Sequence, residues 1–333
     1  MPFPTDPAYA AGLTEAQELA ARGSHQEALD RCVPLLAHAG DPFRRAYLLG
    51  LIAALANATG RFPEAEQAYQ YALADARAIP RPDFLADFSL ELGELYLNLG
   101  RPREAEACFA RAGREFGVRA GPEQSFAIRQ GLANCCLDQG KYRRAKELVA
   151  EMAALPEFSR HASRRLGIAF LEARVALFLG EEKAVHRVIG ALQQNIQGGG
   201  QTYLLPYLEL LQGKVALIEG RYQESLRHFE KADAGFAAQG DLTGRVEARL
   251  AMTAPMLEFR WIREAQRILH PLAMWERGEE FPALRHSIQL RRLALSAFLG
   301  VWVKRDLDLL REDPHRRGSL EEWIQFWFHL SLA

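Results

Sequence analysis

Two helical patterns meet at a glycine within Leu90–Gly113, whose sequence is LELGELYLNLGRPREAEACFARAG. On each side of Gly100, apolar or small residues recur at i, i+3 or i+4 and i+7, the spacing of an amphipathic α-helix. Glycine lets the chain leave the first helix through a conformation that a side chain disfavours. The stretch therefore predicts a helix–turn–helix unit. In the first such unit, Ser24 and Glu27 form a capping-box pattern that predicts the start of its second helix.

The same unit recurs along the chain, mostly with a period of forty residues. The turn positions are Gly23, Gly60, Gly100, Gly140, Gly180, Gly220, Arg260 and Gly300. The residues five positions after a turn are small: Ala28, Ala65, Ala105, Ala145 and Ala265, with Val185 and Ser225 as near matches. A single helical hairpin cannot bury its own apolar face, so successive hairpins must stack into a solenoid. The sequence predicts an all-α chain with about eight repeats over residues 7–317.

Composition agrees with helices and excludes several classes of protein. Of 333 residues only six are Thr and ten are Val, so strand formers are scarce. The 41 Lys and Arg balance 42 Asp and Glu, which argues against a dedicated nucleic-acid binder. The longest apolar stretch, Tyr47–Ala58, is too short to cross a bilayer, and the first residues lack the pattern of a signal peptide. Four Cys give no disulfide framework. We expect a cytoplasmic protein that neither inserts into a membrane nor binds nucleic acid directly.

No pattern of catalytic or cofactor chemistry is present. The chain lacks the nucleotide-binding, nucleophile-elbow and zinc-protease motifs. Gly198–Gly200 has no preceding strand, and we interpret it as a flexible link between repeats five and six. The nine His fall at different repeat positions and would not converge on a metal, and the Cys behave as small apolar residues. We therefore expect no enzyme activity, no cofactor and no metal site.

The third unit carries a recognisable series of residues: Leu92, Gly93, Tyr96, Gly100, Ala105, Phe109 and Ala112. This series resembles the tetratricopeptide repeat (TPR). The longer period, as in His228–Leu250, is similar to the repeats of bacterial MalT-type and Rap-type regulators and of LGN-type adaptors. The resemblance implies a right-handed superhelix in which the first helix of each hairpin lines the concave surface.

The resemblance also implies which residues would face a partner. They lie thirteen, ten, six and two residues before each turn position. The candidate partner-binding residues are Asp87, Glu94, Asn98, Gln130, Asn134, Asp138, Phe170, Arg174, Phe178, Tyr207 and Lys214. The series is acidic and amide-rich in repeats three and four, and then places Arg174 and Lys214 among aromatic residues. Such a wall suits an extended peptide or a partner helix. The alternative is that these polar residues simply face water.

Two functions fit these features. The first is a non-enzymatic adaptor or scaffold that binds a peptide or helix of another protein in the groove. The alternative is a TPR regulator that senses a ligand or peptide and signals through a separate effector protein. The sequence favours the first, because nearly all of it is repeat.

A final helix is expected over residues 318–333, as a cap or an interaction element. Ser319 and Glu322 form a capping box at its start. Most of its circumference is apolar, which implies burial on more than one side. Its candidate contacts to a second copy of the chain or to another protein are Trp323, Phe326, Trp327 and Phe328. The alternative is that Phe326 and Phe328 fold back onto their own chain near Trp302 or Leu309.

Overall fold

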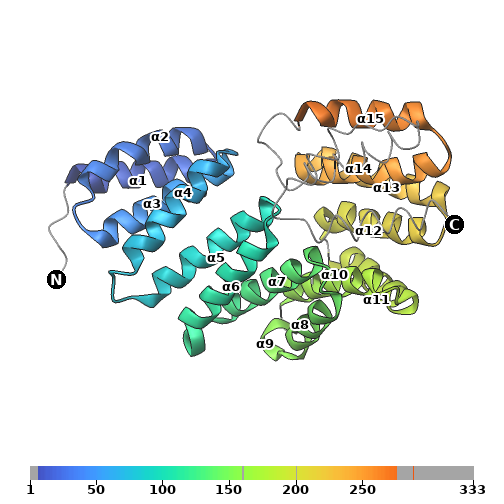
Figure 1. The fold of residues 1–333 in the computed structure, drawn as a ribbon, viewed down its shortest axis with the longest axis horizontal. Helices are drawn as coiled ribbons and strands as arrows, with labels where there is room; N and C mark the ends of the chain where they lie inside the picture. Colours follow the sequence, from blue (N-terminus) through green and yellow to red (C-terminus); the bar gives the residue numbers. More distant parts are fainter. Residues whose placement is uncertain (1–6, 160, 200, 276–287, 289–333) are drawn as a thin grey trace. The chain divides into compact units, whose positions relative to one another are not determined.

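The computed structural model describes residues 7–159, 161–199, 201–275 and 288, and within these it contains helices and no strands (Figure 1). The described residues form seven helix pairs, which confirms the all-α repeat fold. The first helices of the pairs are α1 (Pro7–Ala21), α3 (Pro42–Ala58), α5 (Pro82–Asn98), α7 (Pro122–Asp138), α10 (Ala162–Phe178), α12 (Leu205–Ile218) and α14 (Leu242–Glu258). The second helices are α2 (His25–Leu35), α4 (Phe62–Ala76), α6 (Pro102–Phe116), α8 (Tyr142–Ala154), α11 (Glu182–Gly199), α13 (Tyr222–Gln239) and α15 (Ile262–Trp275).

Short elements join some of the pairs. They are α9 (Pro156–Ser159) and the 3₁₀ turns η1 (Leu36–His38), η2 (Gly117–Arg119) and η3 (Thr202–Leu204). The eighth expected pair and the final helix with Trp323, Phe326, Trp327 and Phe328 lie outside the described residues. The prediction of an apolar contact helix at residues 318–333 therefore stays a prediction.

The chain divides into two compact units. The N-terminal unit comprises residues 1–99 and 103–132, and the C-terminal unit comprises residues 100–102 and 133–333. No helix among the described residues is long and apolar enough to cross a membrane.

The expected turn positions within the described residues all adopt the left-handed conformation. The φ angles are +82° at Gly23 and between +68° and +76° at the five following turn glycines. Arg260, which replaces glycine in the seventh repeat, also has a positive φ, of 57°. The turn is closed in the same way there, since the Trp261 amide donates to the Met256 carbonyl at 2.8 Å and the Arg260 amide to that of Leu257 at 3.0 Å. These two bonds are the Schellman pattern that satisfies the last carbonyls of a helix.

The small residues after each turn lie where the two helices of a pair approach most closely. The five alanines of this column have no exposed surface, and Val185 is 2% exposed. Ser225 is also fully buried, and its hydroxyl donates to the Gly213 carbonyl at 2.8 Å. That hydrogen bond explains why a polar residue is accepted at an alanine position.

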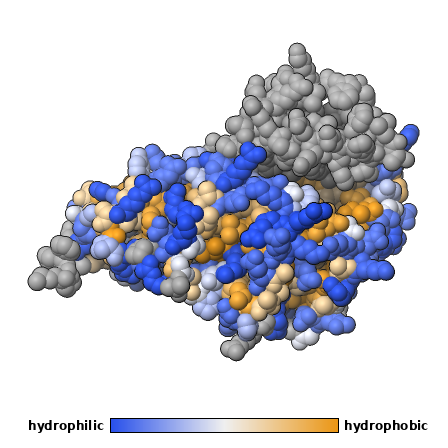
Figure 2. All heavy atoms as spheres, turned by 60° about the horizontal axis from the view of Figure 1, so that its bottom comes forward, coloured by the Kyte–Doolittle hydropathy of each residue, from blue (hydrophilic) through white to orange (hydrophobic). Residues whose placement is uncertain are grey.

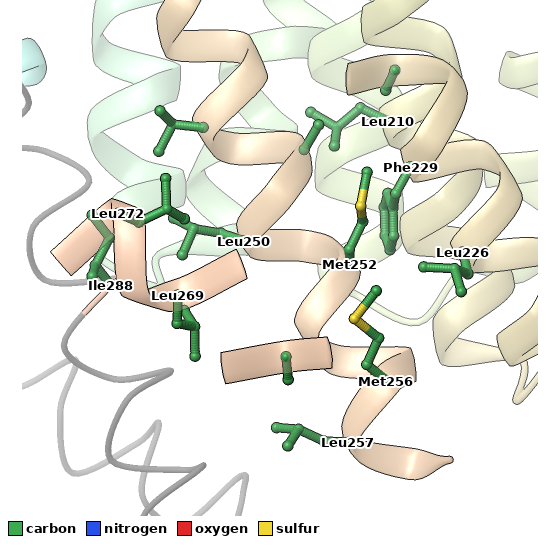
Figure 3. Close-up of a cluster of buried hydrophobic side chains, with 14 of the residues drawn as sticks. Leu210, Leu226, Phe229, Leu250, Met252, Met256, Leu257, Leu269, Leu272 and Ile288 are labelled. Atoms are coloured by element: carbon green, nitrogen blue, oxygen red, sulfur yellow. The ribbon is translucent and has the colours of Figure 1, made fainter. Parts of the chain in front are cut away.

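Larger apolar residues fill the space between successive pairs. The residues nine positions after each turn, from Cys32 and Tyr69 to Leu269, are buried. In the C-terminal unit, Phe229 of α13 packs against Met252 of α14, and Leu250 and Leu272 extend the same cluster to α15 (Figure 3). In this cluster a helix pair therefore completes its core with the following pair, as a stacked repeat requires.

The prediction at Ser24 was confirmed only in part, and the interpretation of the glycine run as a link was wrong at Gly198 and Gly199. Helix α2 begins at His25, as the capping pattern predicts. Ser24 stands at the N-cap of α2 but its side chain makes no capping hydrogen bond, because its φ and ψ of −78° and 58° depart from the extended cap conformation. The capping carboxylates are instead Asp41 and Asp241, which accept from the amides of Arg44 and Gly244. Gly198 and Gly199 are not a link, because they form the last turn of α11.

Candidate partner-binding face

The first helices carry all the predicted partner-binding residues, and each unit holds its own share of them. Asp87, Glu94 and Asn98 are exposed on α5 of the N-terminal unit. Gln130 is half-buried on α7. The other seven belong to the C-terminal unit. We call the surface formed by these residues the first-helix face, and describe it separately for each unit.

The N-terminal part of this face is acidic. Asp87 and Glu94 reach the solvent, but the surrounding protein displaces part of the water around their carboxyl groups. This desolvation raises the pKa of both residues, and the negative charges of Asp83 and Glu91 respectively raise them further. Glu91 was not among the predicted residues, yet it stands between the two on α5, and its pKa is raised chiefly by burial. The Tyr69 hydroxyl lies 3.5 Å from Glu91 Oε2. Desolvation raises these pKa values most, and repulsion between carboxylates on one helix adds to it.

The C-terminal part contains a hydrogen bond between successive repeats. Arg174 Nη1 of α10 donates to Asn134 Oδ1 of α7 at 2.9 Å. Both residues stand six positions before their turn glycine, as predicted, so this column brings side chains of adjacent repeats into contact. The acceptor is a neutral amide, which leaves the guanidinium charge uncompensated by this bond.

Lys214 of α12, the next residue of the column, has a different kind of partner. Its Nζ lies 2.6 Å from Glu247 Oε1 of α14. The positive charge of Lys214 lowers the pKa of Glu247 in spite of the partial loss of hydration around this half-buried carboxylate, and Arg174 contributes to the same effect. Lys214 is therefore already paired, and Glu247 was not among the predicted residues. The sequence could have indicated Glu247, because it stands thirteen residues before the turn position Arg260, just as Asp87 and Tyr207 stand thirteen residues before theirs.

Exposed aromatic residues surround these polar groups in the C-terminal unit. Phe178 is 52% exposed and stacks on Tyr142, with ring centroids 5.0 Å apart. Tyr207 is 41% exposed, and its hydroxyl donates to Asp241 Oδ2 at 2.7 Å. Burial and that bond raise the pKa of Tyr207 to about 12. Phe170 is half-buried, and Asp138 is exposed near the end of α7. Figure 2 shows one face of the molecule, on which hydrophobic and hydrophilic residues lie side by side.

Two surface cavities of the C-terminal unit lie away from this face. One, of about 250 Å³, is lined by residues such as Ala162 and Arg165 at the start of α10 and Gln194 of α11. The other, of about 370 Å³, lies at the turn around Arg221 and Phe259. Neither of these two cavities is lined by a predicted binding residue.

The described residues offer no grouping of side chains suited to a metal. No cluster of three or more His, Cys, Asp or Glu has the required geometry there. None of the four cysteines forms a disulfide, and all are buried. Burial raises the pKa of Cys32 to about 11, which keeps that thiol protonated and unreactive at neutral pH.

Tandem helix pairs, left-handed turns and a polar first-helix face define a helical repeat protein with the tetratricopeptide-type fold. No protein-family model matches this chain, and no curated protein matches its sequence. Solved structures do match. A Rap protein complexed with Competence and Sporulation Factor is 13% identical with a TM-score of 0.56, over 88% of this chain and 98% of that one.

Two further structures share the fold. A tetratricopeptide repeat protein from Parabacteroides merdae is 18% identical with a TM-score of 0.53, over 76% of this chain and 86% of that chain. A signal transduction ATPase with a tetratricopeptide repeat sensor, from Pyrococcus horikoshii, is 13% identical with a TM-score of 0.53. The match covers 95% of this chain but 48% of the ATPase. At these identities the similarity establishes the fold.

Proposed function

We propose that this chain is a non-enzymatic interaction module whose first-helix face holds an extended segment or helix of a partner protein. The observation that carries the proposal is the Arg174–Asn134 pair. It presents a guanidinium that is oriented by a neutral amide, beside exposed aromatic residues. An arginine fork binds a carboxylate through two charge-assisted hydrogen bonds, while aromatic neighbours supply apolar contact.

The acidic N-terminal part of the face supports the same function with the opposite charge. The pKa values of Asp87, Glu91 and Glu94 are raised by desolvation and then by repulsion between neighbouring carboxylates, so a cationic group of a partner would stabilise their charged forms. The acidic part of the face in the N-terminal unit therefore suits a basic residue of a partner, and the C-terminal unit suits an acidic one.

The test compares two arginines of the C-terminal unit. A partner is first captured from lysate of the source organism, identified and purified. Its affinity is then measured for the wild type, for Arg174→Gln and for Arg187→Gln, an exposed arginine of α11 whose side chain is 75% exposed. We expect Arg174→Gln to weaken binding about tenfold, or ~1.4 kcal/mol. Arg187→Gln should bind as the wild type does. Equal affinities of all three proteins would show that the first-helix face is not the binding site.

A sensing regulator is the second candidate, and a specific similarity favours it. The Rap structure contains a bound Competence and Sporulation Factor, and the ATPase carries its repeats as a sensor. A chain of this kind would bind a peptide or small ligand and pass the signal to a separate effector. A ligand that binds the folded state raises the melting temperature. A shift with purified metabolites in the absence of any partner protein would favour the regulator over the adaptor.

A further inference from the structure

We propose that Glu247 is a specificity-determining residue, which occupies Lys214 and so restricts the C-terminal part of the first-helix face to one carboxylate of a bound segment. This inference rests on the proposed function. It specifies how many acidic residues of a partner the C-terminal part of the face accepts, and which residue limits that number.

Arg174 and Lys214, which both stand six residues before a turn glycine, have different partners in the structure. The Lys214 ammonium is 2.6 Å from the Glu247 carboxylate, and both side chains are about two-fifths exposed. Arg174 makes one hydrogen bond to a neutral oxygen, and among the described residues its Nε and Nη2 groups have no hydrogen-bond partner. An incoming carboxylate can therefore bind Arg174 without displacing a protein group, but at Lys214 it has to displace Glu247.

Repulsion strengthens this difference. The charge of Lys214 holds the pKa of Glu247 below its ordinary value, so Glu247 is ionised at neutral pH. A second acidic residue of a partner that approached Lys214 would face this negative charge at close range. A rejecting group beside an attractive one is a common route to selectivity. The charge of Glu247 also acts on Arg174. Glu247 is hydrogen-bonded to Lys214, however, whereas Arg174 is hydrogen-bonded to Asn134. A carboxylate can therefore still reach the guanidinium of Arg174, while Glu247 excludes a second acidic residue from Lys214.

Replacement of Glu247 by Gln keeps the size and the hydrogen-bonding oxygen of the side chain but removes the charge. Lys214 then becomes available to a second carboxylate. A matched control is Glu181→Gln. Glu181 pairs with Lys146 in the same unit, also at 2.6 Å. Lys146 lies on α8, the second helix of its pair, and so lies outside the first-helix face.

The experiment selects peptides directly, so it does not require an identified partner protein. A phage library of random dodecapeptides is panned on the immobilised full chain as wild type, Glu247→Gln and Glu181→Gln, and circular dichroism confirms that all three are folded. We expect the wild type and Glu181→Gln to enrich peptides with one acidic position, and Glu247→Gln to enrich peptides with two. Synthetic peptides with one or two Glu then quantify the effect. The peptide with two Glu should bind Glu247→Gln about tenfold tighter than it binds the wild type.

The outcomes separate the two proposals. If the wild type selects one acidic position and Glu247→Gln selects the same, the role of Glu247 is wrong while the proposed function stands. Wild-type peptides that already carry two acidic positions also contradict the role of Glu247. If the wild type selects no acidic position, the carboxylate contact at Arg174 is wrong and both proposals fail.

Discussion

The ring of Phe229 lies directly against the backbone of Gly213, so that a Cβ added at Gly213 would come within 2.4 Å of the ring atom Cε1. Phe229 has no exposed surface and is enclosed by the core of α13 and α14. The ring therefore cannot move aside without cost, and the contact joins a first helix to its own second helix.

Gly213→Ala should consequently destabilise the protein by about 1–3 kcal/mol, the usual effect of overpacking a core. The control is Gly190→Ala in α11, where an added Cβ meets nothing within 4 Å. That change should stabilise the protein by about 0.5–1 kcal/mol, because alanine is the better helix former. Urea denaturation followed by circular dichroism measures both. Similar midpoints for the two variants would contradict this account of packing.

Arg260→Gly should stabilise the seventh repeat. Arg260 has a φ of 57°, a conformation that costs a non-glycine residue about 1–2 kcal/mol. Glycine removes this strain, although its greater freedom in the unfolded chain offsets about half of the gain. We expect an increase of up to about 1 kcal/mol in the free energy of unfolding. The reverse change, Gly220→Arg, should lower it, and a lower melting temperature for Arg260→Gly would refute the prediction.

Ala105→Glu should be among the most damaging single changes. Ala105 is fully buried where α5 and α6 approach, and a carboxylate there has neither space nor a partner. The expected loss is about 3–5 kcal/mol. Ala107→Glu, at an exposed position two residues along the same helix, should change stability by less than about 0.5 kcal/mol. Thermal melts of the two variants test the prediction, which fails if they coincide.

Glu94→Gln and Glu247→Gln should change stability in opposite directions with pH. The pKa of Glu94 is raised in the folded state, so its charge destabilises the fold above that pKa and has no effect below the unfolded value near 4.5. Glu94→Gln should therefore stabilise at neutral pH, and the gain should vanish in acid. The pKa of Glu247 is lowered, so its stabilisation is present above about 4.5 and is lost as the pH falls through the folded value. Glu247→Gln should destabilise at neutral pH only. Unfolding curves from about pH 3 to 7 would contradict this if the two variants showed the same sign.

The helix expected over residues 318–333 can be tested by oligomeric state. Sedimentation at micromolar concentration is compared for the wild type and Phe326→Glu/Phe328→Glu. If the helix forms a self-complementary contact, the wild type sediments as a dimer and the double variant as a monomer. A monomer in both cases removes the homodimer and leaves a cap or a different partner.

The repeat itself could be read from the sequence because it depends on local chemistry. Turn glycines, alanines at close helix contacts and apolar periodicity are each set by conformation or volume at one position, and they recur at fixed spacing. Even Arg260 was located by spacing alone, and the structure confirms its left-handed turn. The residues of the first-helix face were likewise identified by their columns, through the resemblance to known repeats.

What the sequence alone could not decide is which of those side chains are already paired. Lys214 and Arg174 are both cations six residues before a turn glycine, so the sequence alone does not distinguish them. Only the packing of α14 against α12 brings Glu247 to the Lys214 ammonium, whereas Arg174 meets the neutral oxygen of Asn134. Ser24 is a similar case, since its capping pattern is present but its backbone angles prevent the hydrogen bond. The spacing of the repeat determines which residues share a face. The hydrogen-bond partners of Lys214 and Arg174, however, lie 33 and 40 residues away in the chain, on other helices. Their distances therefore depend on how the helices pack in the tertiary fold.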